Sequence, residues 1–206
     1  MKGKSPLAGE GQDAYLLFLI YAGVGVGTVL VAQPGRQALL LVALAIVSLV
    51  YRNGHEVDVQ FSLANLGRGA ILGLVASVPL LAFVPETLAR FSESLYNTDN
   101  ALVVFYSASF AAAPVEEYFF RGIIAERCGS SPSAGLYALA GFIYFLPSAP
   151  IARAAIAALA MGILGVVYTY IHENHGLTAA VGCHLAVTFV LQVCPLLLGP
   201  LRFILS

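Results

Sequence analysis

Long apolar stretches separated by short polar segments run along the whole chain. Crossing about 30 Å of hydrocarbon takes roughly 20 apolar residues in a helix. Seven stretches come near this length: Ala14–Ala32, Ala38–Tyr51, Gly69–Leu88, Ala101–Ile124, Ser133–Leu146, Ile151–Ile171 and Leu177–Leu198. The second and fifth are short, so we expect each to be either a little-tilted helix in a thin region or a re-entrant or protein-buried helix.

Short segments rich in turn-forming residues separate these stretches, for example residues 33–36, 96–100 and 129–132. Because the connections are short, the chain is expected to form one compact bundle. The fold class that we predict is all-α, a polytopic transmembrane helical bundle of about seven helices, as a single membrane domain over residues 1–206. The segment from Glu56 to Arg68 fits either an interfacial amphipathic helix or a loop.

The composition indicates that lipid is the solvent for most of the chain. Hydrophobic residues make up 59% of it and charged residues only 10%, whereas soluble domains carry about 25% charged residues. The net charge is −1, so no basic surface indicates nucleic acid, and the lipid bilayer is the expected partner. The three cysteines are far apart and form no CxxC pair, which argues against a disulfide framework or a structural zinc site.

Three charged residues interrupt the stretch at 101–124. Glu116, Glu117 and Arg121 lie within six residues of an otherwise apolar helix, where each charge costs about 2.5–3.5 kcal/mol near the bilayer centre. Glu117 and Arg121 have the i, i+4 spacing of a helical ion pair, which leaves Glu116 free to meet water or a substrate. Pro114 lacks a backbone N–H, and the bend that we expect there opens space next to Glu116. The alternative is an ion pair that caps a helix at the interface.

His184 lies about two turns into the last apolar stretch. An imidazole at this depth is expected to face the bundle interior or a water-filled cavity. Thr188 follows one turn later, so its hydroxyl shares the same helix face. The alternative is a buried histidine that bonds a backbone carbonyl.

Glu-Glu-x-x-x-Arg followed by Gly, together with a later intramembrane histidine, resembles the CPBP (Abi) family. This family comprises CAAX proteases, which include the CAAX prenyl endopeptidases, and bacteriocin-processing proteins. The resemblance covers about residues 101–198, the catalytic half of the family. It implies that Glu116 is a general base that activates water, that Glu117 and Arg121 orient it, and that His184 is an oxyanion donor or a proton shuttle.

Two positions depart from the family pattern. The second motif is divergent, because Phe145 stands where alignment on Leu-Pro places a histidine. In the third motif, Thr188 replaces an asparagine or aspartate four residues after His184. The neighbouring Tyr144 offers a hydroxyl in place of the missing imidazole. We expect no cofactor; zinc is the open alternative, although a catalytic zinc wants three protein ligands and Glu116 and His184 supply only two.

The leading hypothesis is an intramembrane endopeptidase of the glutamate type. Its expected substrate is a membrane-anchored or lipid-modified protein or peptide, cut near the membrane, and its expected location is a prokaryotic cell membrane. One alternative is an inactive relative that binds a membrane partner as a scaffold. Another is an ion- or proton-coupled transporter, because intramembrane Glu, Arg and His also form proton relays.

Overall fold

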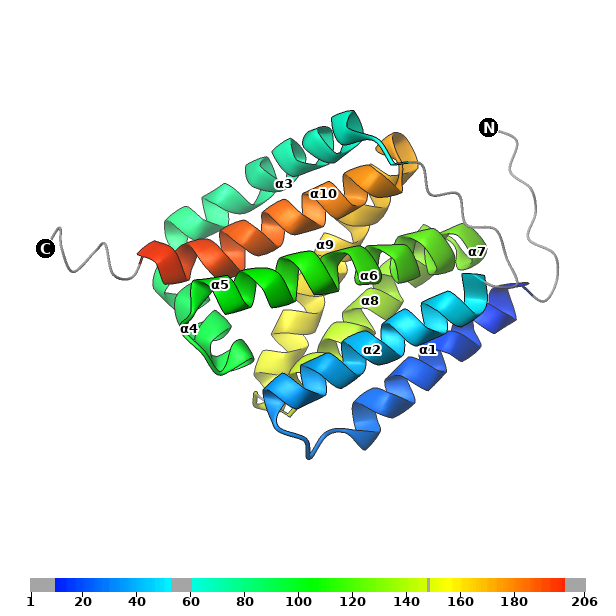
Figure 1. Ribbon diagram of the computed structural model, residues 1–206, viewed down its shortest axis with the longest axis horizontal. Coiled ribbons are helices and arrows are strands. Elements are labelled where there is room, and N and C mark those ends of the chain that lie inside the picture. The colour runs from blue at the N-terminus through cyan, green and yellow to red at the C-terminus, as the bar shows by residue number, and fades with distance from the viewer. Residues whose placement is uncertain (1–9, 53–60, 148, 199–206) are drawn as a thin grey trace, which may run out of the picture.

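The computed structural model describes residues 10–52, 61–147 and 149–198, and all regular structure in these ranges is helical (Figure 1). Short segments named η have π-helical hydrogen bonding. Eight continuous helices result. They are α1 (Glu10–Gly27), α2 (Gln33–Arg52), α3 (Leu63–Phe83), α4 (Pro85–Tyr96), a long helix of five parts, namely α5 (Ala101–Val104), η1 (Phe105–Ala112), α6 (Ala113–Glu117), η2 (Tyr118–Ala125) and α7 (Glu126–Cys128), then α8 (Ser130–Phe145), α9 (Ile151–His175), and α10 (Leu177–Thr188) with η3 (Phe189–Val193). The predicted all-α bundle is confirmed.

Two of the differences between the predicted and observed helix boundaries lie at prolines. Residues 33–36, expected as a break, form the first turn of α2, since proline is well tolerated in the first turn of a helix. The predicted stretch Gly69–Leu88 is divided, because α3 ends at Phe83 and Pro85 begins the separate helix α4. α4 is amphipathic and contributes no long apolar run, so apolar periodicity alone did not reveal it as an eighth helix.

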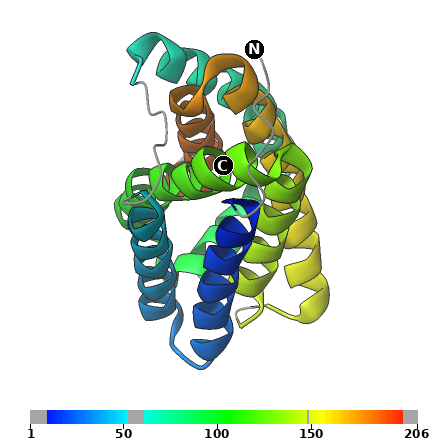
Figure 2. The ribbon, with the colours of Figure 1, turned by 90° about the vertical axis from the view of Figure 1, so that its right-hand side faces the viewer.

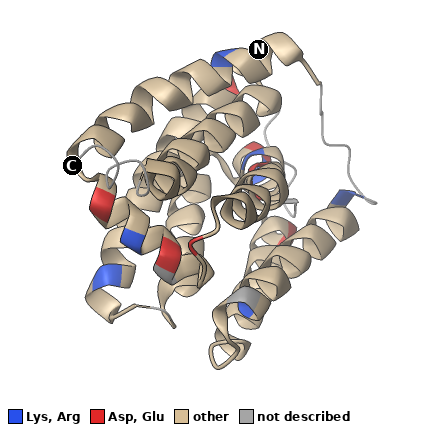
Figure 3. Cartoon of the chain, turned by 60° about the vertical axis from the view of Figure 1, so that its left-hand side comes forward, with Lys and Arg blue, Asp and Glu red and all other residues tan. Residues whose placement is uncertain are grey.

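Within the described part of the chain, four helical segments are long and apolar enough to cross a membrane: Gly35–Arg52, Leu63–Phe83, Ile151–His175 and Leu177–Leu198. Most of the helical ribbon is free of charged residues (Figure 3). Together with the composition, these segments make the chain an integral membrane protein. The predicted fifth stretch corresponds to α8, which has seven buried residues and is not one of the four. Residues 53–60 lie outside the described residues, and the rest of the segment to Arg68 includes the start of α3.

The long helix α5–α7 crosses the middle of the bundle, with α3 and α10 on one side and α1 and α2 on the other (Figures 1 and 2). Small residues bring α3 and α10 into backbone contact. A Cβ at Gly69 would lie 1.8 Å from the carbonyl oxygen of Ala179, and one at Gly182 would lie 2.2 Å from that of Leu66. Such close approach is how helices associate in lipid, where hydrophobicity alone gives little attraction between them.

Arg36 joins three helices at one end of the bundle. Its guanidinium is fully buried and donates hydrogen bonds to the carbonyl oxygens of Gly25 at 2.9 Å, Ile143 at 2.7 Å and Tyr144 at 2.8 Å. These carbonyls belong to the last turns of α1 and α8, where helices carry partial negative charge and unpaired acceptors. The sequence placed Arg36 in a turn, but its role is to cap two helix ends from within the bundle.

Candidate active site

The two glutamates lie between two π-helical segments of the central helix. η1 precedes them and η2 follows, and the backbone N–H of Ala113 donates to the carbonyl of Ala108, five residues earlier. Pro114 comes directly after this wider turn, so the helix accommodates the missing N–H by local π geometry. A third π segment, η3, follows the helix that carries His184. Such π-helical segments are often found at functional sites, since they shift side chains relative to their positions in a regular α-helix.

Glu117 is the buried centre of the charged group. Its side chain has no exposed surface, and its Oε1 lies 3.2 Å from Arg121 Nη1 and 2.8 Å from His184 Nδ1. The predicted i, i+4 ion pair between Glu117 and Arg121 is therefore confirmed. One carboxylate oxygen links the motif on the central helix to the histidine on α10.

Arg121 is held from several sides. It is fully buried, and its Nη2 donates to the carbonyl of Gly165 on α9 at 3.1 Å. Its guanidinium carbon lies 4.4 Å from the ring centre of Tyr137 and 5.2 Å from that of Tyr168. Aromatic faces attract cations, so the two tyrosines stabilise the charge of this fully buried guanidinium.

Glu116 is placed differently from its neighbour. A quarter of its side chain, 25%, is exposed. Its Oε2 accepts a hydrogen bond from the hydroxyl of Tyr137 at 3.1 Å and lies 3.9 Å from His184 Nε2. Glu117 is thus fully buried in the ion pair, whereas Glu116 keeps an exposed surface, as the spacing predicted.

His184 lies between the two glutamates. The residue is 7% exposed, and its ring stacks on that of Tyr168, with ring centres 4.8 Å apart and an angle of 16° between the planes. Nδ1 faces Glu117 while Nε2 points toward Glu116. The prediction that this imidazole faces the bundle interior is confirmed, and its bonding partner is a carboxylate instead of a backbone carbonyl.

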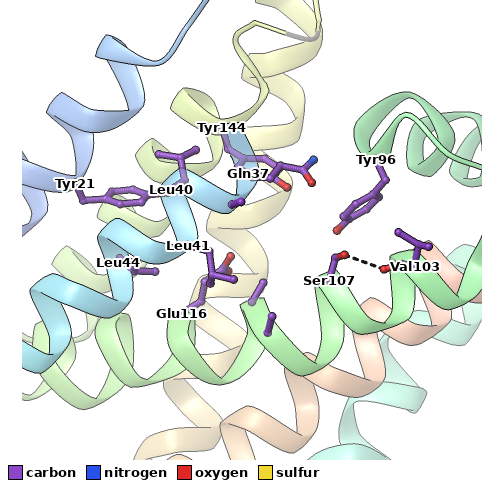
Figure 4. A pocket seen from close by; sticks show the side chains of 13 residues that line it. Tyr21, Gln37, Leu40, Leu41, Leu44, Tyr96, Val103, Ser107, Glu116 and Tyr144 are labelled. Carbon is purple, nitrogen blue, oxygen red and sulfur yellow. Dashed lines mark hydrogen bonds between the residues drawn. The ribbon is translucent and has the colours of Figure 1, made fainter. Parts of the chain in front are cut away.

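Two cavities meet at Glu116. We call the first, of about 240 Å³, the α2 cavity, since five residues of α2 line it, and the second, of about 280 Å³, the central cavity. Figure 4 shows Glu116 pointing into the α2 cavity between α2 and the central helix. Five residues line both: Tyr21, Tyr96, Ala112, Glu116 and Tyr144. The exposed part of Glu116 therefore faces open space inside the bundle.

The three supporting residues proposed from the sequence also border this space. Tyr144 lines both cavities, while Phe145 and Thr188 line the central cavity together with His184. Phe145 packs against Phe91 of α4, with ring centres 5.3 Å apart. The position where the family pattern has a histidine is thus an apolar wall of the central cavity.

Residues 98–190 match a family model described as type II CAAX prenyl endopeptidase Rce1-like. These residues form an Rce1-like domain. The resemblance inferred from the motifs is confirmed, and at the level of the family the domain is that of a CAAX-type intramembrane protease. No curated protein matches the chain, and neither does any solved structure.

All seven residues predicted for the site lie within the Rce1-like domain, but part of the cavity wall lies outside it. Tyr21 of α1, Gln37 of α2 and Tyr96 of α4 line the α2 cavity, and all three precede residue 98. The first helices therefore complete the site that the matched domain carries.

Sequence reasoning missed Tyr137 and Tyr168, which contact the charged group. A usable signal existed for Tyr137, because it lies seven residues before Tyr144 and shares its face of α8. No such signal existed for Tyr168, whose stacking on His184 depends on how α9 and α10 pack.

Within 10–52, 61–147 and 149–198, no three His, Cys, Asp or Glu residues are grouped so that they could hold a metal ion. Glu116, Glu117 and His184 lie near one another, but Glu117 Oε1 and His184 Nδ1 are already hydrogen-bonded to one another.

Replacing Tyr137 with phenylalanine should slow any reaction that depends on Glu116. The variant keeps the ring over Arg121 and removes only the hydrogen bond to Glu116 Oε2. Hydrogen bonds to charged groups contribute about 1.5–3 kcal/mol, so we expect the turnover rate to fall about tenfold with little change in thermal stability. Tyr137→Leu, which also removes the ring, should lower both. An unchanged rate in Tyr137→Phe would show that this bond does not position the carboxylate.

Proposed function

We propose that the protein is a glutamate-type intramembrane endopeptidase in which Glu116 activates water. One observation carries the proposal. The carboxylate of Glu116 is partly exposed where two cavities meet inside a bundle of apolar helices, and a histidine and a tyrosine hydroxyl face the same oxygen. A carboxylate inside a membrane-embedded bundle is energetically costly and is usually functional, and proton abstraction from water is a function that fits this site.

In the proposed reaction, a water between Glu116 and the substrate carbonyl loses its proton to Glu116 and attacks the carbonyl carbon. Glu117 accepts a hydrogen bond from Nδ1–H of His184, which leaves Nε2 facing the reaction as an acceptor. His184 then takes this proton from Glu116 at Nε2 and passes it to the amine nitrogen, which leaves as the C–N bond breaks. Glu117 and Arg121 hold the histidine in this orientation.

Tyr144 is proposed to stabilise the oxyanion. It lines both cavities, as Glu116 does, and it neighbours Phe145, which stands in place of the family's second histidine. A hydroxyl can donate to the developing negative charge without carrying a charge itself. Thr188 borders the same cavity one turn after His184 and can hold a water there.

The substrate proposed is a membrane-anchored or lipid-modified protein or peptide, cut near the membrane. The site lies inside the bundle and its walls are largely apolar, so a substrate held in the bilayer can reach it. The compact chain fits a prokaryotic cell membrane.

The direct test is hydrolysis by the purified protein in proteoliposomes. A set of single-span reporter proteins with varied juxtamembrane sequences would be incubated in ¹⁸O-labelled water and the products analysed by mass spectrometry. We expect cleavage of at least one reporter, with one ¹⁸O in the new C-terminal carboxylate. Absence of cleavage across the set, or cleavage without label, would contradict the proposal.

The hydrolysis is expected to need no metal ion. Glu116 and His184 offer two ligands toward the cavities, while Glu117 is occupied by Arg121 and His184. Cleavage in the presence of EDTA or 1,10-phenanthroline should therefore stay within about twofold of the untreated rate, since no ion has to be replaced. A loss that added zinc restores would show instead that a metal takes part.

The second candidate is an inactive scaffold that binds a membrane protein in the same cavities. Phe145 and Thr188 favour it, because both replace residues of the family pattern. In cells that lack the native protein, full restoration of its phenotype by Glu116→Gln would support the scaffold. Failure of that variant, present in the membrane at the wild-type level, would support proteolysis.

A further inference from the structure

The central cavity has a row of polar side chains along one helix. His184, Thr188 and Gln192 line it from α10 and η3 at steps of four residues, so they follow one another on the same helix face. The lining from α4, α8 and α9 consists of apolar side chains and tyrosines, among them Phe91 and Phe145. His184 takes part in the proposed reaction, whereas Gln192, the last of the row, has no role in it.

The side-chain amide of Gln192 uses its oxygen and keeps its NH₂ group. Its Oε1 accepts a hydrogen bond from the hydroxyl of Tyr96 at 2.8 Å. Its Nε2 donates to no residue in the part of the chain that the structure describes. Hydroxyl groups elsewhere in the lining can donate or accept, but an amide NH₂ group only donates. A ligand that pairs with Gln192 therefore has to offer an acceptor.

Tyr96 fixes the orientation of this amide. It is the last residue of α4 and lines both cavities, and Figure 4 shows it reaching from α4 toward the central helix. The same turn of α4 is held by Gln37 of α2, whose side-chain amide donates to the carbonyl of Leu95 at 2.6 Å. Because its oxygen is held, the amide of Gln192 cannot turn freely. Its NH₂ group is thus positioned before a ligand arrives, which reduces the entropy lost on binding.

An unpaired donor beside a largely apolar cavity favours a ligand that brings an oxygen to it. When a substrate displaces water from the cavity, an N–H group left without a partner costs free energy. The main chain of a peptide carries a carbonyl oxygen at every residue. A hydrogen bond from Gln192 to one of these oxygens removes that cost and holds the substrate main chain against η3.

We infer that Gln192 is a substrate-binding residue that donates a hydrogen bond to a main-chain oxygen of the substrate, about three or four residues from the scissile bond. This inference rests on the proposed function, which places the scissile bond beside Glu116 and His184. The two steps of four residues from His184 to Gln192 rise about 12 Å along a helix, and an extended chain covers this length in about three or four residues. The oxygen belongs to an internal peptide bond or to a terminal carboxylate.

The affinity for a lipidated peptide tests this hydrogen bond apart from cleavage. The probe is an N-palmitoylated nonapeptide of leucine and alanine that ends in a carboxylate. Its dissociation constant is measured by energy transfer in nanodiscs, with Glu116→Gln as the starting protein so that turnover does not intervene. Adding Gln192→Met should weaken binding about tenfold. The control is Leu191→Met, which changes a neighbouring lining residue without a hydrogen bond and should stay within about twofold.

Unchanged affinity after Gln192→Met would overturn the inference, and so would failure of the starting protein to bind the probe. Peptides that lack one main-chain oxygen then show whether Gln192 contacts the substrate or only supports the cavity wall. Each internal carbonyl is removed in turn by an (E)-alkene isostere, and the terminal carboxylate by a methyl group. One removal should weaken binding about tenfold when Gln192 is present and less than about twofold in Gln192→Met, which has no donor to lose. The position of that removal distinguishes an internal carbonyl from the terminus. Equal losses in both proteins at every position would contradict a contact with the substrate.

Tyr96→Phe tests whether the tyrosine positions the amide, because it removes the hydroxyl and keeps the ring. It should weaken binding of the nonapeptide about threefold when Gln192 is present and cause no further loss in Gln192→Met. Additive losses would contradict a role that acts through Gln192. If one oxygen depends on Gln192 but no reporter is hydrolysed, the proposed function fails alone. If reporters are hydrolysed and no oxygen depends on Gln192, only this inference fails.

Discussion

Glu116→Gln is expected to lower the rate of reporter cleavage by at least about 1,000-fold. An amide cannot take a proton from water, and positioned general acid–base groups contribute roughly 10²–10⁴-fold. The fold should survive, because Glu116 is partly exposed and its one hydrogen bond, from the Tyr137 hydroxyl, can be made equally well to the amide oxygen. Initial cleavage rates and thermal unfolding in detergent measure the two effects.

The control for this change is Glu93→Gln. Glu93 lies on α4 and is exposed, so the same substitution there should leave both rate and stability unchanged. Wild-type cleavage by Glu116→Gln would exclude Glu116 as the base. A large loss of thermal stability in Glu116→Gln would show that the carboxylate has a structural role that the geometry does not suggest.

Glu117→Leu is expected to lower the free energy of unfolding by about 3–5 kcal/mol, as removal of one partner from a buried ion pair does. Arg121 would be left fully buried with its charge unpaired, and His184 would lose its bond to Oε1. Chemical denaturation in mixed micelles measures the change. We also expect loss of cleavage, because His184 would no longer be oriented.

The double variant Glu117→Leu with Arg121→Met separates charge burial from other effects. It removes both charges, so a large part of the lost stability should return while cleavage stays absent. If the single Glu117 variant loses less than about 1 kcal/mol, the pair is not a principal support of the bundle. If the double variant is no more stable than the single one, the unpaired arginine is not what destabilises it.

Much of the charged group was predictable because burial in lipid leaves few explanations for a charge. The spacing of Glu117 and Arg121 predicts their ion pair, and the depth of His184 predicts that its ring faces inward. Both predictions follow from the geometry of a single helix and from the cost of placing a polar side chain in lipid. The structure places all of these residues together.

What the sequence did not reveal depends on contacts between distant segments or on small changes in backbone geometry. The partners of Arg36 are backbone carbonyls up to 108 residues away. Because every residue has a backbone carbonyl, the sequence does not indicate which ones Arg36 binds. A shift from α to π hydrogen bonding around Glu116 does not alter the apolar pattern either. Helix α4 was missed since its surface is half polar, while the search was for long apolar runs.

The three hydrogen bonds of Arg36 have a consequence for any attempt to work with the matched segment alone. They tie α2 to the last turns of α1 and α8, and α8 carries Tyr137 and Tyr144. A fragment trimmed to residues 98–190 would leave the carbonyls at the end of α8 without their donor and would open the side of the site that α2 closes. The minimal unit for reconstitution or engineering therefore includes the first two helices.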